Sequence, residues 1–323
     1  MHYLVIGGAG YIGSHMVKCL VAEGATVTVL DDLSSGHRDA VLGGQLIVHD
    51  FADRAFLDQL FSDTRFDGVF HFASQILVGE SVINPAKYYR ANTVATLTLL
   101  EAMRDHAINH FVFSSTAAVY GEPDYVPIDE QHPKVPVNPY GASKYMVEMM
   151  LSDFHRAHGL KYVALRYFNA AGADPQARLG ERHEPETHLI PLALKAVLGK
   201  KPPLKLFGRD YDTPDGTCIR DYIHVDDLSS AHLLAMQYLQ NGGESTVFNL
   251  GNGTGYSVQE VIDVVAKVTD KPVPVEHAPR REGDPARLVA DAAKAKSVLG
   301  WEPALNDLET IVQHAWNWES QAQ

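Results

Sequence analysis

The chain has 323 residues, of which 46% are hydrophobic and 21% are charged, and its formal net charge is −13. This composition is typical of a globular enzyme, and the length can hold one large α/β domain with a smaller lobe, or two compact domains. The negative charge argues against nucleic acid or an anionic membrane surface as the partner. A polyanionic ligand would therefore need a local group of arginines.

No stretch of the sequence has the apolar length of a membrane-spanning helix, and the first residues do not form a signal peptide. Cys19 and Cys218 are far apart and lack metal-binding spacing. The 16 histidines are scattered and include no HExxH motif. We therefore expect a cytoplasmic protein with reduced cysteines and no metal site.

The first half of the chain alternates short apolar runs with longer helical patterns. Six runs predict buried parallel strands: Tyr3 to Gly7, Thr26 to Asp31, Leu46 to His49, Gly68 to Phe72, His110 to Ser114 and Tyr162 to Phe168. Three patterns predict helices between them: Ile12 to Glu23, Tyr88 to Asp105 and Tyr140 to His158. Such alternation indicates an α/β fold with a doubly wound parallel sheet of the Rossmann type.

The second half of the chain has a different pattern. Residues 171–187 and 207–217 are rich in Gly, Pro, Asp and Arg and predict long loops, and residues 189–199 predict one apolar helix. A strand and helix at about 219–240 could rejoin the first sheet. We therefore predict a nucleotide-binding domain over residues 1–168, rejoined by about 219–240. Residues 169–218 and 241–323 would form a smaller, discontinuous C-terminal lobe that binds the substrate.

A glycine-rich turn follows the first predicted strand and opens the first predicted helix. Gly7, Gly10 and Gly13 allow a tight turn, a close approach of the backbone to a pyrophosphate and close packing of helix on sheet. Asp31 ends the second strand, where a carboxylate can hold an adenosine ribose and repel a 2′-phosphate. The pattern predicts an NAD site.

A second motif is Tyr140-Gly141-Ala142-Ser143-Lys144, which follows the helix-starting pair Asn138-Pro139. Tyr140 and Lys144 then lie one turn apart on one helix face. A phenol titrates near ~10, but a neighbouring ammonium and an oxidised nicotinamide favour the phenolate. Tyr140 could therefore act as a base near neutral pH.

Hydroxyl side chains end the buried strand that lies upstream of this helix. Ser114, Ser115 and Thr116 follow directly on the apolar run His110 to Phe113. Ligand chemistry in a doubly wound sheet gathers at the carboxyl ends of its strands. A hydroxyl at this position can hydrogen-bond a substrate alcohol and complete a Thr-Tyr-Lys set.

Together with these motifs, several stretches give the chain a resemblance, nearly from end to end, to the UDP-galactose 4-epimerases of the extended short-chain dehydrogenase superfamily. Beyond the glycine turn and Asn138 to Lys144, the stretches are His71 to Ala73, Val78 to Ser81, Ser114 to Thr116, Val119 to Gly121, Leu165 to Asn169, Asp215 to Val225 and Arg281 to Asp284. The resemblance implies an isomerase that interconverts UDP-glucose and UDP-galactose. Tyr140 would take the C4 hydroxyl proton while hydride passes to NAD, and the 4-keto sugar would turn over before hydride returns.

The resemblance also assigns roles by position. Thr116 and Tyr140 would lie at the sugar C4 hydroxyl, with Lys144 on the nicotinamide ribose. The cofactor would be lined by Gly7, Gly10, Tyr11, Ile12, Gly13, Asp31, Asp50, Phe51, Phe72, Ala73, Asn92, Thr116, Tyr140, Lys144 and Phe168. The UDP-sugar would be held by Thr116, Tyr140, Asn169, His188, Leu189, Phe207, Arg220, Arg281, Asp284 and Leu288. The two arginines suit a diphosphate, which needs fixed cations in an acidic protein.

Three positions depart from the family pattern. Thr116 stands where relatives often have Ser, but it keeps the hydroxyl. Ile76 stands where some relatives carry a Lys near the cofactor, which bears on how tightly NAD is retained. Leu288 is intermediate between the bulky Tyr and the smaller side chains that set the room for the sugar 2-substituent, so N-acetylated sugars stay open.

Three other functions are compatible with parts of this pattern. A 4,6-dehydratase or a related decarboxylase typically needs acidic residues where this chain has Ala117 and Ala118. An epimerase of a UDP-pentose or UDP-hexuronate has nearly the same core motifs and stays the main alternative. An NAD-binding regulator without catalysis usually loses the Tyr or Lys that are present here.

Apolar residues on two predicted helices exceed what one sheet face needs. They lie within Tyr88 to Asp105 and within Lys144 to His158, where Met146, Val147, Met149, Met150 and Leu151 occur. Core packing explains part of this excess. Because relatives pair such helices between subunits, we also predict a homodimer.

Overall fold

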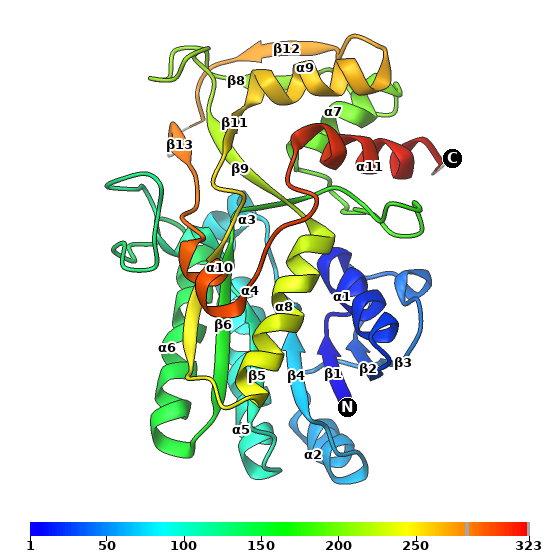
Figure 1. The fold of residues 1–323 in the computed structure, drawn as a ribbon, viewed down its shortest axis with the longest axis vertical. Coiled ribbons are helices and arrows are strands. Elements are labelled where there is room, and N and C mark those ends of the chain that lie inside the picture. Colours follow the sequence, from blue (N-terminus) through cyan, green and yellow to red (C-terminus); the bar gives the residue numbers. More distant parts are fainter. Residues whose placement is uncertain (282–283, 322–323) are drawn as a thin grey trace.

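A computed structural model describes residues 1–281 and 284–321, and within them a large parallel sheet organises the chain (Figure 1). The strand order is β10-β6-β5-β4-β1-β2-β3, and every neighbouring pair is parallel. The strands are β1 (His2–Ile6), β2 (Thr26–Asp31), β3 (Gln45–Val48), β4 (Gly68–His71), β5 (His110–Ser114), β6 (Lys161–Tyr167) and β10 (Thr246–Leu250). The order reverses beside β1, which creates the crevice in which such sheets bind nucleotides. The predicted fold class is confirmed.

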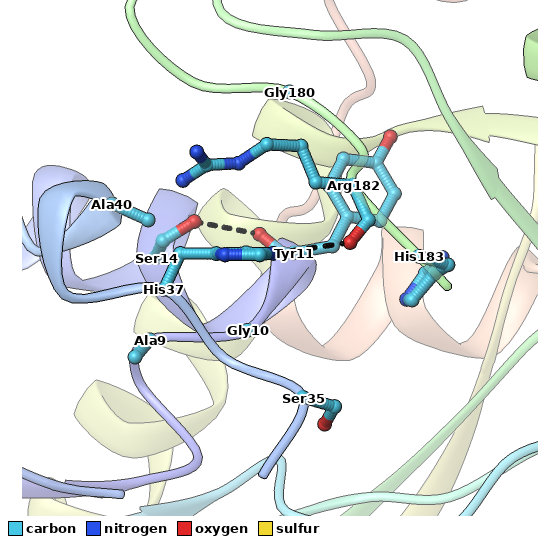
Figure 2. A pocket seen from close by; sticks show the side chains of 10 residues that line it. All are labelled: Ala9, Gly10, Tyr11, Ser14, Ser35, His37, Ala40, Gly180, Arg182 and His183. Atoms are coloured by element: carbon cyan, nitrogen blue, oxygen red, sulfur yellow. Dashed lines mark hydrogen bonds between the residues drawn. The ribbon is translucent and has the colours of Figure 1, made fainter. Parts of the chain in front are cut away.

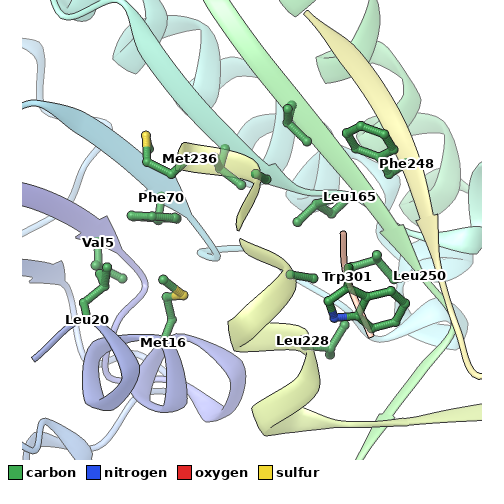
Figure 3. Close-up of a cluster of buried hydrophobic side chains, with 14 of the residues drawn as sticks. Val5, Met16, Leu20, Phe70, Leu165, Leu228, Met236, Phe248, Leu250 and Trp301 are labelled. Atoms are coloured by element: carbon green, nitrogen blue, oxygen red, sulfur yellow. The ribbon is translucent and has the colours of Figure 1, made fainter. Parts of the chain in front are cut away.

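Helices cover both faces of this sheet because successive strand side chains point to opposite sides. On one face, Tyr3 and Val5 of β1 pack with α1 (Tyr11–Ala22) and α8 (Val225–Gln240) (Figure 3). On the other face, Leu4 and Ile6 share a core with the remaining helices. Those helices are α2 (Arg54–Asp63), α5 (Ala95–Asp105) and α6 (Pro139–His158). Burial on both faces explains the continuous apolar runs.

Short helices connect or extend these elements. They are η1 (Arg38–Ala40), α3 (Val78–Ile83), α4 (Pro85–Tyr88), the π-helical η2 (Tyr89–Val94) and η3 (Ala117–Val119). The helix predicted over 88–105 thus begins as α4 and contains a π-helical turn before α5. Helix α6 follows its prediction, because the Asn138 side chain caps it by accepting from the Gly141 N–H at 2.9 Å and Gly159 ends it at φ 74°.

A smaller lobe lies over the end of the sheet away from the N-terminus (Figure 1). Its first sheet joins β11 (Gly255–Ser257), β9 (Ile219–His224), β13 (Arg287–Leu288) and β7 (Asn169–Ala171). A second sheet pairs β8 (Leu204–Phe207) with β12 (Val275–Ala278). Its core also contains α7 (Leu189–Val197), α9 (Val258–Thr269) and α11 (Leu308–Gln321).

The predicted return of residues 219–240 to the large sheet is wrong for the strand. Strand β9 is paired with β7, β11 and β13 in the lobe, although its Ile223 belongs to the core of the large sheet. Helix α8 packs on the large sheet. The strand that joins the large sheet is β10, which the prediction had placed in the lobe from residue 241. Helix α10 (Ala293–Leu299) also contacts β10 and α8 rather than the lobe. Trp301, fully buried, belongs to the same core as β10 (Figure 3).

Candidate active site

The predicted cofactor residues all lie at or just beyond the carboxyl ends of the central strands or on the helices that face this edge. Gly7 to Gly13 form the turn from β1 into α1, and Asp31 ends β2. The others follow β3 (Asp50, Phe51), β4 (Phe72, Ala73), β5 (Thr116) and β6 (Phe168), or lie on η2 (Asn92) and α6 (Tyr140, Lys144). This single edge is where a doubly wound sheet binds its ligand.

The glycine turn leaves no room for side chains. Gly7 has φ 78°, and a Cβ there would lie 2.4 Å from the Ala73 nitrogen. A Cβ on Gly13 would lie 2.1 Å from the Gly7 carbonyl oxygen, so this contact sets how closely α1 approaches β1. The first N–H groups of α1 have no acceptor within the helix and face this turn, as an anion site requires.

Asp31 ties the turn to the end of β2. Its carboxylate accepts hydrogen bonds from the Ala9 and Leu33 N–H groups, each at 2.9 Å, and the residue is buried. Burial raises the pKa of Asp31, while the two backbone donors act in the opposite direction. A carboxylate fixed in this way keeps free lone pairs that can accept from ribose hydroxyls.

Asn92 has a supporting position at this edge. Its side chain accepts from the Gln75 N–H at 2.8 Å and donates to the Gln75 carbonyl at 3.0 Å and to the Ser143 hydroxyl at 3.0 Å. It therefore clamps the segment after β4, which includes Ile76, onto α6. Phe72 packs against His232 with ring centroids 4.8 Å apart.

The structure brings the three predicted catalytic side chains together where β5 ends and α6 begins. The Tyr140 hydroxyl interacts with the Thr116 side chain, and the Lys144 ammonium donates to the Ser114 carbonyl at 2.9 Å. Burial raises the pKa of Tyr140, and the interaction with Thr116 lowers it. Burial lowers the pKa of Lys144 to about 7, although the charge of Glu148 opposes this change. A lysine so close to neutrality can gain or lose its proton under working conditions.

Behind this cluster lies a buried ion pair that the motifs did not predict. Glu148, one further turn along α6, pairs with Arg166 of β6 and accepts from the Ser115 hydroxyl at 2.5 Å. Arg166 also donates to the Tyr120 hydroxyl at 2.9 Å. These bonds fix α6 against β5 and β6, and thereby position Tyr140 and Lys144.

The lobe pocket is a cavity of about 190 Å³, and seven of the predicted substrate residues line it. Those residues are Asn169, His188, Leu189, Phe207, Arg220, Arg281 and Asp284. Asp284 contacts both guanidinium groups, that of Arg220 and, at 3.0 Å, that of Arg281. Two cations thus share one carboxylate, which leaves positive charge for an anionic ligand. Glu282 and Gly283, from the same sequence stretch, lie outside the described residues.

Residues that line the lobe pocket make a cation–π contact and a hydrogen bond to the backbone. Arg281 lies over the Phe207 ring at 5.0 Å, and Asn169 donates to the Asp221 carbonyl at 2.9 Å. Ile190 and Tyr222 also line the pocket. Neither was assigned a role from the sequence, although Tyr222 lies in the stretch Asp215 to Val225 that carries the resemblance. Five of the six residues of β9 are buried, so the burial pattern of this strand does not single out Tyr222.

The remaining predicted substrate residues lie outside the lobe pocket. Thr116 and Tyr140 belong to the catalytic cluster. Leu288 stands opposite Arg220 in the β13–β9 register and packs in the small core that contains Val119 and Phe168. Leu288 therefore lies between the lobe pocket and the catalytic cluster.

A second hollow, of about 40 Å³, opens beside the glycine turn (Figure 2). Gly10 and Tyr11 line it from one side, and Gly180, Arg182 and His183 of the loop before α7 line it from the other. The Arg182 guanidinium pairs with both oxygens of Asp39, at 2.7 and 2.9 Å, which attaches this loop to the segment after β2. The sequence carried no motif for these loop residues.

His188, a predicted substrate residue, contacts carboxylates of its own loop in the structure. Its Nδ1 lies 2.6 Å from Glu181 Oε1 and 3.1 Å from Glu186 Oε1. Burial lowers the pKa of His188, but the charges of the two glutamates outweigh it and raise the pKa to about 10. The residue still lines the lobe pocket.

The fold and both pockets are those of a nucleotide-dependent enzyme acting at the edge of a Rossmann sheet. The sequence matches the NAD dependent epimerase/dehydratase family over residues 3–251, and the chain belongs to that family. The turn at Gly7 to Gly13, the carboxylate of Asp31 and the Tyr140–Lys144 pair fit NAD as its cofactor.

The similarity extends over the whole chain. The chain is 53% identical to the UDP-glucose 4-epimerase of Halalkalibacterium halodurans over 321 residues, which cover 99% of this chain and 96% of that protein. A UDP-glucose 4-epimerase from Brucella ovis in complex with NAD superposes with a TM-score of 0.96 at 47% identity, covering 98% and 97% of the two chains. The UDP-Glc/GlcNAc 4-epimerase of Campylobacter jejuni has a TM-score of 0.88 at 46% identity, covering 99% of each chain. The described residues contain no helix long and apolar enough to cross a membrane.

Proposed function

We propose that this chain is a UDP-glucose 4-epimerase, which interconverts UDP-glucose and UDP-galactose through a transient 4-keto sugar. The observation that carries the proposal is the separation of two sites. The hydroxyls of Tyr140 and Thr116 meet at the sheet edge, while Arg220 and Arg281 line a pocket in the lobe. Relatives that match the whole chain carry the same name.

The chemistry at the sugar requires a base and a hydride acceptor, because a C4 hydrogen is not acidic. NAD, when bound, accepts a hydride and returns it. Tyr140 accepts the C4 hydroxyl proton, and Thr116 holds the same oxygen by a hydrogen bond. Lys144 lies one turn further along α6, where it would hold the nicotinamide ribose and favour the phenolate. The Glu148–Arg166 pair keeps this helix in place.

Inversion also requires the sugar to present its other face after oxidation. The UDP moiety is therefore the anchor, and the lobe that contains α7, α9, α11 and β9 binds it. Arg220 and Arg281 bind the diphosphate by charge-assisted hydrogen bonds, and Phe207 and Asn169 line the nucleotide end of the pocket. Ala117 and Ala118 follow Thr116 in η3 and offer no carboxylate for the elimination that a dehydratase performs.

The test is to incubate the purified protein with UDP-galactose, without added NAD, and to separate the nucleotide sugars by chromatography. Tyr140→Phe is the catalytic variant, and Tyr125→Phe, at an exposed tyrosine, is the matched control. We expect UDP-glucose from the wild type and the control but not from Tyr140→Phe. Product that forms only after NAD is supplied would reflect weak retention near Ile76. No product even with NAD would refute the hexose assignment.

A second candidate substrate class is UDP-N-acetylhexosamine, and Leu288 is the observation that favours it. This side chain lies between the lobe pocket and the catalytic cluster and is smaller than a tyrosine. A structural relative with 46% identity carries both UDP-Glc and UDP-GlcNAc in its name. The same chromatographic assay with UDP-N-acetylglucosamine, a UDP-pentose and a UDP-hexuronate ranks these alternatives.

We also propose that the enzyme is a cytoplasmic homodimer. Met146 and Met149 on α6 are 37% and 46% exposed, and Val94 on the adjacent η2 is 56% exposed. On α3, which contacts α6, Val82 and Ile83 are 62% and 86% exposed. Apolar side chains gathered over neighbouring helices are typical of a subunit interface. Light scattering at a monomer mass would contradict the proposal.

A further inference from the structure

Four side chains with metal-ligating atoms converge in the loop that precedes α7. They are Glu181, His183, Glu186 and His188, and one ligand atom from each lies within 4.8 Å of the others. Glu181 Oε1 lies 2.9 Å from His183 Nδ1 and 2.6 Å from His188 Nδ1, which is itself 3.1 Å from Glu186 Oε1. The four residues come from eight consecutive positions, so the loop must fold back on itself to bring them together.

Both carboxylates of this cluster are buried, and His188 contacts each of them. The Glu181 side chain is 5% exposed and that of Glu186 is 1% exposed. Glu186 Oε2 has no hydrogen-bond donor among the described residues, and the ammonium of Lys195 is 3.5 Å away. That ammonium also pairs with Glu319 at 3.4 Å. Buried anionic oxygens without full partners are the environment in which a bound cation is most stabilising.

We propose that Glu181, His183, Glu186 and His188 bind one divalent transition-metal ion, with zinc as the preferred metal. Two imidazole nitrogens and two carboxylate oxygens form a set that suits zinc, whereas magnesium requires oxygen ligands. Ligands at about 2.0–2.1 Å in a tetrahedron are roughly 3.3 Å apart. The three contacts of 2.6 to 3.1 Å would thus open by about 0.2 to 0.7 Å, and pairs of ligand atoms separated by up to 4.8 Å would close toward the same spacing.

The place of the site in the fold suggests what the ion does. Gly180, Arg182 and His183 line the hollow beside the glycine turn, while His188 and Leu189 line the lobe pocket. The ion would crosslink the loop that supplies residues to both cavities, and would hold these residues in position. Its role is structural, because the catalytic hydroxyls of Tyr140 and Thr116 belong to a different part of the sheet edge.

The test begins with the full-length protein dialysed against a chelator and then titrated with zinc chloride by calorimetry. We expect one zinc per chain, and a thermal unfolding midpoint that rises when zinc is added. Glu181→Gln and His183→Gln should each weaken zinc binding by at least about 100-fold, since even outer-shell substitutions cost 10–100-fold. Their circular dichroism spectra would establish that they remain folded.

Two variants serve as matched controls. Glu184→Gln changes an exposed carboxylate of the same loop that is outside the cluster. His314→Gln alters a second histidine pair, in which His224 and His314 lie 3.0 Å apart. Both should bind zinc like the wild type. The proposal is overturned if the wild type binds no zinc, in which case the cluster is an imidazolium held by two carboxylates, or if Glu181→Gln and His183→Gln bind it unchanged.

Discussion

Lys144 places a cationic side chain inside the protein, and its energetic consequence can be measured. The residue is 3% exposed, donates to the Ser114 carbonyl at 2.9 Å and lies 4.8 Å from the centre of the Phe113 ring. Burial lowers its pKa from the ordinary 10.5 to about 7, against the opposing charge of Glu148. The folded chain therefore binds this proton more weakly than the unfolded chain does.

The sign of the pH dependence follows from this difference. Unfolding takes up a proton between about pH 7 and 10.5, so the free energy of unfolding rises with pH across that window. Well below pH 7 the buried charge costs about 5 kcal/mol. At pH 7, where folded Lys144 is half protonated, the cost is about 4 kcal/mol, and at pH 9 it is about 2 kcal/mol.

Lys144→Met removes the charge and keeps the length of the side chain. Urea unfolding of NAD-free protein should find the variant more stable than the wild type by about 3 kcal/mol at pH 7, after about 1 kcal/mol for the lost hydrogen bond to Ser114. This advantage should fall by about 2 kcal/mol at pH 9. Lys267→Met, at an exposed ion pair with Glu309, is the control and should change stability by less than about 1 kcal/mol.

A variant that is less stable than the wild type at both pH values, or an advantage that does not shrink at pH 9, would refute this reasoning. Either result would mean that Lys144 is stabilised by its surroundings rather than strained by them. The epimerase assay tests whether the reaction requires Lys144. Lys144→Met should be inactive with UDP-galactose, so a residue that destabilises the fold would be one that the reaction requires.

Three further substitutions test separate parts of the site. Gly13→Ala should lose NAD on purification, because its Cβ would lie 2.1 Å from the Gly7 oxygen. The control Gly79→Ala, whose Cβ would have nothing within 4 Å, should retain NAD. Equal amounts of nucleotide released from the two variants on denaturation would contradict this prediction. Arg281→Met should raise the KM for UDP-galactose roughly 10- to 100-fold with little change in kcat, because a charge-assisted contact to the substrate is lost. An unchanged KM in steady-state kinetics would show that Arg281 is not part of the substrate site. Met149→Asp should convert the dimer to a monomer by light scattering, and a persistent dimer would place the interface elsewhere.

The parts of the site that could be predicted from the sequence are those specified by local spacing. Gly7, Gly10 and Gly13 are required by one turn, and Tyr140 and Lys144 share a face because they are one helical turn apart. Asn138 caps that helix as its residue type predicts. In each case neighbouring residues in the sequence are neighbours in space, so no long-range pairing had to be known.

The errors lie where pairing between distant segments decides the structure. β9 and β10 are both short strands that could extend the large sheet, and β10 does so because Thr246 to Leu250 align in register with Val163 to Tyr167. β9 instead gains partners from β7, β11 and β13, which are three residues long or less and too short to recognise alone. Strand membership depends on these cross-strand contacts more than on the strand's own sequence.

The position of Leu288 depends both on its own short strand and on pairing with a distant segment. Its role depends on a two-residue strand that pairs with β9, and this pairing places it beside Arg220. Its side chain packs in the same small core as Val119, which follows shortly after Thr116. If the UDP moiety is fixed by Arg220 and Arg281 while the sugar turns before Tyr140, the turning sugar must pass the side chain at this position. Substituting Leu288 by Tyr should therefore discriminate against a 2-acetamido group more strongly than against a hydroxyl, since the larger substituent needs the space that the added ring would occupy.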